Sequence, residues 1–391
     1  MPKITAFING YLCLRGKLDE NSFFINRATG LIVSEPQDRP DEVVDLNGKV
    51  IAPAYIELQT NGCVGVHFTH YEDPLAYQTN LKKVSEYMVS RGVGGFWATV
   101  PTVSSDVFQK VLPQLRPQEF AEGATLLGAH TEGPWLNPTK KGAHDSSLMQ
   151  SPIDSSPTIV YGESNIRSNI KMVTLAPELP GSLDFIRTLT RDHGIVVSLG
   201  HSAATYECGI EALRAGAQTL THVFNAMNPL HHRTPGLAGL IASPAAPFYS
   251  LIPDGIHLHP ATLTLAFRAN PERCILITDS IEMAGLPDGL YPGHSQIPRE
   301  QRKEGNKVTI DGTDTLIGSC SSIDECVRNL MGWSGCSLPE AVRCVTENVA
   351  NLMKDQERGM LEQGRRADFV ILDRDGYVLQ TWIKGARVFE R

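Results

Sequence analysis

The sequence lacks any hydrophobic stretch near the length of a membrane span, which excludes transmembrane segments. Its first residues, MPKITAFINGYLCL, have neither the basic start nor the long apolar core of a secretory signal peptide. Its eight cysteines are scattered without a C-x-x-C pair or zinc-ribbon spacing, a pattern typical of reduced thiols rather than disulfides. We therefore expect an intracellular, cytoplasmic protein.

The charge balance excludes another class of partner. Lys and Arg number 35 against 43 Asp and Glu, and the formal net charge of −8 disfavours non-specific nucleic-acid binding. An anionic small substrate stays possible, because it needs only a local cationic pocket. We expect a small-molecule substrate, with no nucleic acid and no membrane as partner.

Short apolar runs alternate with helical stretches after residue 50. Two of these stretches, residues 74–92 and 206–216, carry apolar residues at helical spacing and end at glycine. Alternating strands and helices predict a parallel sheet, and eight units predict a closed (β/α)8 barrel of the α/β class. The eight predicted strands lie in residues 51–58, 95–100, 125–130, 170–176, 194–200, 219–224, 249–256 and 274–279.

The chain is longer than the barrel requires. Its 391 residues exceed the roughly 250 typical of this fold, and the surplus lies at both ends. Residues 1–52 and 358–391 are rich in short strand-like segments. We expect them to pair into one small β-sandwich domain beside a catalytic barrel of residues 53–357.

Four polar residues stand where predicted strands end, namely Glu132, His201, His222 and Asp279. The C-terminal ends of the strands carry the active site in such barrels. A catalytic zinc site takes three nitrogen or oxygen ligands and keeps one position for water, and Glu132, His201 and His222 supply that set. Asp279 is then the natural base for the water. A lone histidine is more often structural, but four such residues at matching positions favour a metal hydrolase.

Other polar residues are predicted to share this rim of the barrel. Thr102 and Glu178 are expected to serve its structure more than its chemistry. The remaining members of the predicted rim are Gln59, Asn61, Thr99 and the turn of residues 254–257.

Several longer motifs resemble one family. The segments PAYIELQTNG, HTEGPWLNPTKKGAH, LGHSAA, THVFNAMNPLHHRTPG, DGIHLHP, ITDSIEMAG and GRRADFVILD resemble, in order and spacing, the N-acetylglucosamine-6-phosphate deacetylases of the amidohydrolase superfamily. The resemblance covers essentially the whole chain. It implies hydrolysis of the acetamide of N-acetyl-D-glucosamine 6-phosphate to D-glucosamine 6-phosphate and acetate, in amino-sugar catabolism.

The resemblance also implies a role for individual residues. Glu132, His201 and His222 match the metal ligands, Asp279 matches the general base and then acid acting with a metal-bound water, and His144 matches a histidine that polarises the acetyl carbonyl. Substrate contacts are implied for His144, Asn225, Ala226, Arg233 and His257. In this family the arginine at the Arg233 position comes from the neighbouring subunit, which implies a homodimer. The planar guanidinium suits a phosphate group.

The first predicted strand departs from the wider superfamily. Many amidohydrolases carry His-x-His there as two further metal ligands, whereas this chain has Gln59 and Asn61. Amides are poor zinc ligands beside imidazole, so we expect a vacant second-metal position and one divalent ion per subunit, zinc being the expected metal.

Two other functions stay open. An amidohydrolase acting on an N-acyl amino acid or a cyclic amide would keep the metal ligands, but it should lack Arg233 and Asn225 as anion donors. A non-catalytic scaffold barrel should have lost one of Glu132, His201, His222 or Asp279. The sequence retains all of these residues.

Overall fold

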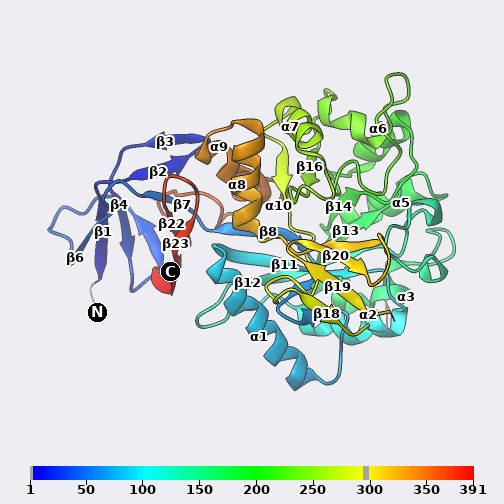
Figure 1. Ribbon diagram of the computed structural model, residues 1–391, viewed down its shortest axis with the longest axis horizontal. Coiled ribbons are helices and arrows are strands. Elements are labelled where there is room, and N and C mark those ends of the chain that lie inside the picture. The colour runs from blue at the N-terminus through cyan, green and yellow to red at the C-terminus, as the bar shows by residue number, and fades with distance from the viewer. Residues whose placement is uncertain (1–2, 294–298) are drawn as a thin grey trace.

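The computed structural model describes residues 3–293 and 299–391, which form a parallel barrel with a pair of β-sheets beside it (Figure 1). Eight parallel strands build the barrel in the order in which they occur along the chain. They are β8 (Tyr55–Thr60), β11 (Val93–Pro101), β12 (Thr125–Glu132), β13 (Ile170–Leu175), β14 (Val196–Leu199), β15 (Thr219–Leu220), β16 (Phe248–Leu251) and β17 (Cys274–Leu276). The predicted α/β barrel class is confirmed.

The barrel closes between its first and last strands through backbone hydrogen bonds. At the C-terminal ends, Asp279 donates to the carbonyl of Gln59 and Asn61 donates to the carbonyl of Ser280. Ile56 and Leu276 both donate to the segment between α9 (Leu338–Arg343) and α10 (Glu347–Met353), at Val345 and Cys344 respectively. The rim residues that follow β8 and β17 are therefore fixed to one another.

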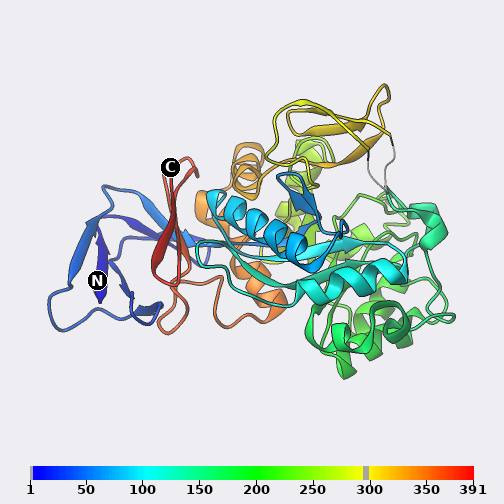
Figure 2. The same cartoon turned by 90° about the horizontal axis from the view of Figure 1, so that it is seen from below.

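Helices follow the barrel strands and cover the outside of the barrel (Figures 1 and 2). In α1, the side chain of Asp73 caps the first turn by accepting from the backbone of Leu75 and Ala76. Its buried residues, among them Leu81, Val84 and Met88, recur at helical spacing and pack against the outside of the barrel. The helices are α1 (Pro74–Ser90), α2 (Ser105–Val111), α3 (Pro157–Tyr161), α4 (Glu163–Ser168), α5 (Ser182–Arg187), α6 (Tyr206–Ala215), α7 (Pro260–Ala269), α8 (Ile323–Ser334), α9 (Leu338–Arg343) and α10 (Glu347–Met353).

The two ends of the chain meet in the flanking sheets, where the blue and red strands lie together in Figure 1. One sheet has the order β5 (Leu31–Val33), β4 (Phe23–Asn26), β1 (Ile4–Ile8), β6 (Glu42–Asp45), and the other β24 (Ala386–Glu390), β23 (Val378–Ile383), β22 (Phe369–Leu372), β7 (Val50–Pro53), β2 (Tyr11–Leu14), β3 (Lys17–Asp19). An aromatic core joins them, with Phe7 and Phe369 edge-to-face at 5.2 Å. The first predicted run, residues 51–58, therefore spans two strands, because β7 belongs to this sheet and only β8 to the barrel.

A further antiparallel sheet lies between β17 and α8, in a segment where the sequence predicted no strand. It consists of β18 (Gly289–Tyr291), β19 (Gln301–Glu304), β20 (Lys307–Ile310) and β21 (Leu316–Ser319). A short hairpin, β9 (Gly62–Cys63) and β10 (Val66–His67), extends the first barrel strand. Ile281 donates to the carbonyl of Ser319, so β21 is tied to the rim just after Asp279. No helix in the described part of the chain has both the length and the apolarity needed to cross a bilayer.

Candidate active site

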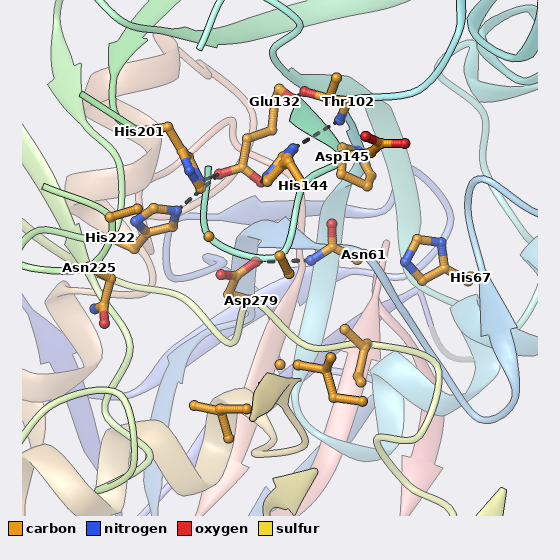
Figure 3. Close-up of a pocket in the computed structure, with 18 of the residues that line it drawn as sticks. Asn61, His67, Thr102, Glu132, His144, Asp145, His201, His222, Asn225 and Asp279 are labelled. Atoms are coloured by element: carbon orange, nitrogen blue, oxygen red, sulfur yellow. Dashed lines mark hydrogen bonds and ion pairs between the residues drawn. The ribbon is translucent and has the colours of Figure 1, made fainter. Parts of the chain in front are cut away.

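Three buried side chains converge at the C-terminal end of the barrel. Nε2 of His201 lies 3.2 Å from Oε1 of Glu132, and Nε2 of His222 lies 3.0 Å from the same oxygen. One ligand atom from each residue lies within 4.8 Å of the other two, the single such cluster of His, Cys, Asp and Glu side chains within residues 3–293 and 299–391. Figure 3 shows the three side chains facing one another. Two imidazoles and a carboxylate at this spacing suit a divalent metal ion.

Hydrogen bonds to neighbouring segments hold the two histidines in place. Nδ1 of His201 lies 2.9 Å from the carbonyl of Lys140, a partner that accepts its proton and holds the ring in one orientation. The backbone N–H of His222 donates to the hydroxyl of Ser250 at 2.8 Å, which fixes the turn that carries it.

The charges within this cluster depend on one another. Burial opposes the charged form of Glu132, but its close contacts with the ring nitrogens of His144, His201 and His222 hold its pKa well below the usual range. Burial lowers the pKa of His201 to about 4. Burial also opposes protonation of His222, but the hydrogen bond and charge of Glu132, with the charge of Asp279, raise its pKa to about 9. Glu132 is therefore ionised and a proton on His222 balances its charge, and a metal ion held by these ligands would displace that proton.

Three of the residues at strand ends have a backbone conformation that is rare outside glycine. The φ angles of His201, His222 and Asp279 are 48°, 28° and 47°. Such left-handed residues cost free energy and concentrate at functional sites. Each strand turns sharply at the residue whose side chain enters the site.

Asp279 lies beside the metal-ligand cluster. Its Oδ1 accepts from Nδ2 of Asn61 at 2.9 Å and from Nε2 of Gln59 at 3.2 Å. Burial and the nearby charge of Glu132 raise the pKa of Asp279, whereas His222, His257 and Asn61 act in the opposite direction. A raised pKa makes a carboxylate a stronger base towards a water molecule.

His144 reaches the cluster from the loop after β12. The backbone N–H of Thr102 donates to its Nδ1 at 3.2 Å, so the ring proton sits on Nε2. That Nε2 lies 3.6 Å from Oε2 of Glu132. The geometry leaves an N–H donor at the metal-ligand cluster, and it gives Thr102, which was expected to be structural, a direct part in orienting His144.

A cavity of about 390 Å³ opens over these side chains. Predicted residues that line it are Asn61, Thr102, Glu132, His144, His201, His222, Asn225, Ala226, His257 and Asp279. Asp254 holds His257 through a contact of 2.6 Å between its Oδ2 and Nδ1. The amide nitrogen Nδ2 of Asn225 is buried without a hydrogen-bond partner, as expected of a group that binds a ligand.

Four other predicted residues do not line the cavity. Gln59 is buried between Glu132 and Asp279, and Thr99 is buried against the backbone N–H of Thr60. Glu178 accepts from Asn137, Ser202 and Ala203 and so ties together the loops that carry His144 and His201. Arg233 is exposed and is not among the described residues that line the cavity.

The cavity also has walls that the sequence did not reveal. Leu316, Ile317 and Gly318 come from β21, and His67 comes from the β9–β10 hairpin. Glu282 also lines the cavity, from a turn three residues after Asp279, where sequence spacing carries no signal. The β21 residues carried no signal, because the sheet to which they belong was not predicted.

An eight-stranded parallel barrel with a Glu–His–His cluster and an aspartate at its strand ends defines a metal-dependent hydrolase. A model of the amidohydrolase family matches residues 50–388. The N-acetylglucosamine-6-phosphate deacetylase of Caenorhabditis elegans is 36% identical, over 99% of this chain and 95% of that protein. The chain therefore belongs to the amidohydrolase family and, within it, to the N-acetylglucosamine-6-phosphate deacetylases, which confirms the predicted resemblance.

Solved structures agree with this placement. The N-acetylglucosamine-6-phosphate deacetylase of Pasteurella multocida superposes with a TM-score of 0.84 at 25% identity, over 99% of this chain and 100% of the other. A mutant of the Mycobacterium smegmatis enzyme, in complex with N-acetyl-D-glucosamine-6-phosphate, gives 0.83 at 26% identity and covers 99% of both chains.

Proposed function

We propose that this protein hydrolyses the acetamide of N-acetyl-D-glucosamine 6-phosphate to D-glucosamine 6-phosphate and acetate. The single observation that carries the proposal is the buried Glu132–His201–His222 cluster beside Asp279 in the 390 Å³ cavity. The name shared by the Caenorhabditis elegans relative and both solved structures supports this substrate. Its place is amino-sugar catabolism in the cytoplasm, a setting with which the eight free thiols agree.

Glu132, His201 and His222 would hold one divalent ion per subunit, and zinc suits this donor set. When bound, such an ion lowers the pKa of a water molecule and polarises a carbonyl oxygen. The second-metal position is vacant in this proposal, because the amides Gln59 and Asn61 stand where histidine ligands would be needed.

The remaining steps fall to side chains around the cluster. Asp279 takes a proton from the attacking water, which its raised pKa favours. The Nε2 proton of His144 stabilises negative charge on the acetyl oxygen as the carbon becomes tetrahedral. Asp279 then returns its proton to the leaving nitrogen. Asn225, Ala226, His144 and His257 bind the sugar phosphate.

The phosphate requires a cation from elsewhere. None of the described residues that line the cavity is a lysine or an arginine. Arg233 stands on an exposed loop that begins soon after His222, where it can reach a second molecule. We assign the enzyme a homodimeric assembly in which Arg233 enters the partner's cavity. The catalytic unit is the barrel of residues 53–357, and the flanking β domain comprises residues 1–52 and 358–391.

Acetate release by the purified protein tests the proposal. N-acetylglucosamine 6-phosphate should be turned over, and unphosphorylated N-acetylglucosamine should be a much poorer substrate at equal concentration. A chelator should abolish turnover, and zinc should restore it. Release of acyl groups from N-acyl amino acids or opening of cyclic amides, without activity on the phosphosugar, would favour a different amidohydrolase. No hydrolysis of any of these by metal-loaded protein would favour a scaffold.

A further inference from the structure

The two amides at the C-terminal end of β8, Gln59 and Asn61, do more than stand in place of metal ligands. Gln59 is the second-last residue of β8 and Asn61 directly follows its last residue, so both side chains leave the chain on the same side. Both donate an amide N–H to the same oxygen of Asp279, Oδ1, at 3.2 Å and 2.9 Å. Among the described residues, none donates to the other oxygen, Oδ2. The two oxygens of this carboxylate are therefore not equivalent.

Gln59 also connects Asp279 to the metal-ligand cluster. Its Nε2 donates to Oε1 of Glu132 at 3.2 Å as well as to Asp279. An amide nitrogen has two protons, and here each has a carboxylate acceptor. The side chain is 1% exposed, so it has little freedom to leave this position. It therefore sets the distance between a ligand carboxylate and the aspartate, two like charges that would otherwise repel each other.

The backbone of β8 holds Asp279 in the same way. The N–H of Asp279 donates to the carbonyl of Gln59, and the N–H of Asn61 donates to the carbonyl of Ser280. Figure 3 shows the side chains of Asn61 and Asp279 facing each other below the metal-ligand cluster. Main-chain and side-chain bonds together fix the left-handed turn at Asp279 and the rotation of its carboxylate.

We propose that Gln59 and Asn61 are positioning residues for the general base: they hold Oδ1 of Asp279 and leave Oδ2 as the oxygen that exchanges the proton. The inference rests on the proposed function, in which Asp279 is that base. It explains why two strongly polar amides are buried at the C-terminal end of β8. Loss of either donor lets the carboxylate rotate, and turnover falls while substrate affinity stays.

A double-mutant cycle tests the proposal. Asn61→Leu removes one donor with little change of shape, and Gln59→Met removes the other. Each should lower kcat by about tenfold to a hundredfold, the range for a hydrogen bond to a charged group, with KM changed less than about threefold. In an Asp279→Asn background, which removes the base, either substitution should change the residual rate by less than about twofold, because residues that act as a unit are not additive.

The matched control is Asn348→Leu. Asn348 is a buried amide that holds the opposite end of β17 through the carbonyl of Cys274 at 2.6 Å. Its loss should lower the melting temperature and act equally with and without Asp279. Elemental analysis should find the same metal content in all folded variants. Gln59→Met and Asn61→Leu are measured in parallel, so the proposal can still be tested if only one of the two variants folds.

Three results would overturn the inference. An equal loss of kcat with and without Asp279 would make the amides merely structural. Unchanged kcat in the single variants would make them dispensable. Metal loss in the single variants would make them part of the metal-ligand sphere. Wild-type turnover by Asp279→Asn alone would instead refute the proposed base, so the two failures can be told apart.

Discussion

Glu57 provides a sharp test of how β8 is built. Its side chain is 0% exposed, and its Oε1 accepts from the backbone N–H groups of Gln59 at 3.1 Å and Thr278 at 3.3 Å, joining β8 to the segment after β17. Its Oε2 is buried without a hydrogen-bond partner and borders a small cavity. Burial raises the pKa of this carboxyl to about 8, although the hydrogen bonds from Gln59 and Thr278 act in the opposite direction. Glu57 is therefore mostly protonated at neutral pH.

The sign and size of the effect on stability follow from this pKa. A folded-state pKa of about 8 instead of 4.5 makes ionisation of Glu57 on the order of 5 kcal/mol more costly in the folded protein than in the unfolded chain. The favourable contribution of the Glu57 carboxyl to the free energy of unfolding is complete below pH 4.5. It is lost progressively as pH rises, because the folded state binds the proton more tightly, and it is gone above about pH 8.

Glu57→Gln should remove this pH dependence. The amide oxygen keeps the position of Oε1 as an acceptor, while the side chain no longer ionises. Urea unfolding of variant and wild type should give similar free energies near pH 5 and a growing advantage for the variant up to about pH 8. Glu86→Gln, on the exposed side of α1, is the matched control for loss of a surface glutamate charge. A difference between variant and wild type that stays constant from pH 5 to pH 9 would refute the reasoning.

Three further predictions concern the reaction. Asp279→Asn should retain metal and substrate binding but lose at least about a hundredfold in kcat, the usual scale of acid–base catalysis; near wild-type turnover in a steady-state assay would contradict this. Glu132→Ala, His201→Ala and His222→Ala should each lose the metal, and fully active wild type should contain one ion per chain by elemental analysis, so two tightly held ions would be a refutation. Arg233→Ala should raise KM for the phosphorylated sugar roughly tenfold to a hundredfold and leave the unphosphorylated sugar unaffected. Mixing Arg233→Ala chains with Asp279→Asn chains should partly restore activity, and no recovery in proven heterodimers would place Arg233 in its own subunit's site.

The positions of the metal-ligand cluster and the base could be predicted because the fold places strand ends together. Glu132, His201, His222 and Asp279 each follow an apolar run, and a parallel barrel brings such positions to one rim. The sequence could not predict the left-handed turns at three of them. Periodicity describes regular strands and helices, whereas those turns depend on tertiary hydrogen bonds such as that from His222 to Ser250.

The part of the site that escaped prediction comes from backbone groups and from the sheet after β17. Thr102 orients His144 through its N–H, a group that every non-proline residue has, so no residue type could reveal it. The strands β18–β21 are only three or four residues long and face the barrel on one side, too short for a clear alternation. The contribution of β21 to the cavity therefore required the structure.

Strand β8 shows how one element joins stability to chemistry. Glu57 and Gln59 alternate along it and Asn61 directly follows its last residue, so the three side chains lie on one face, at the join with the segment after β17. Glu57 holds the backbone before Asp279, and the two amides hold its carboxylate. A strand of apolar residues would bury the same surface without the cost of a buried carboxyl. It would remove the side-chain hydrogen bonds that hold the carboxylate of Asp279. The buried polar face of β8 therefore lowers stability above neutral pH and, in exchange, orients the group on which the proposed proton transfer depends.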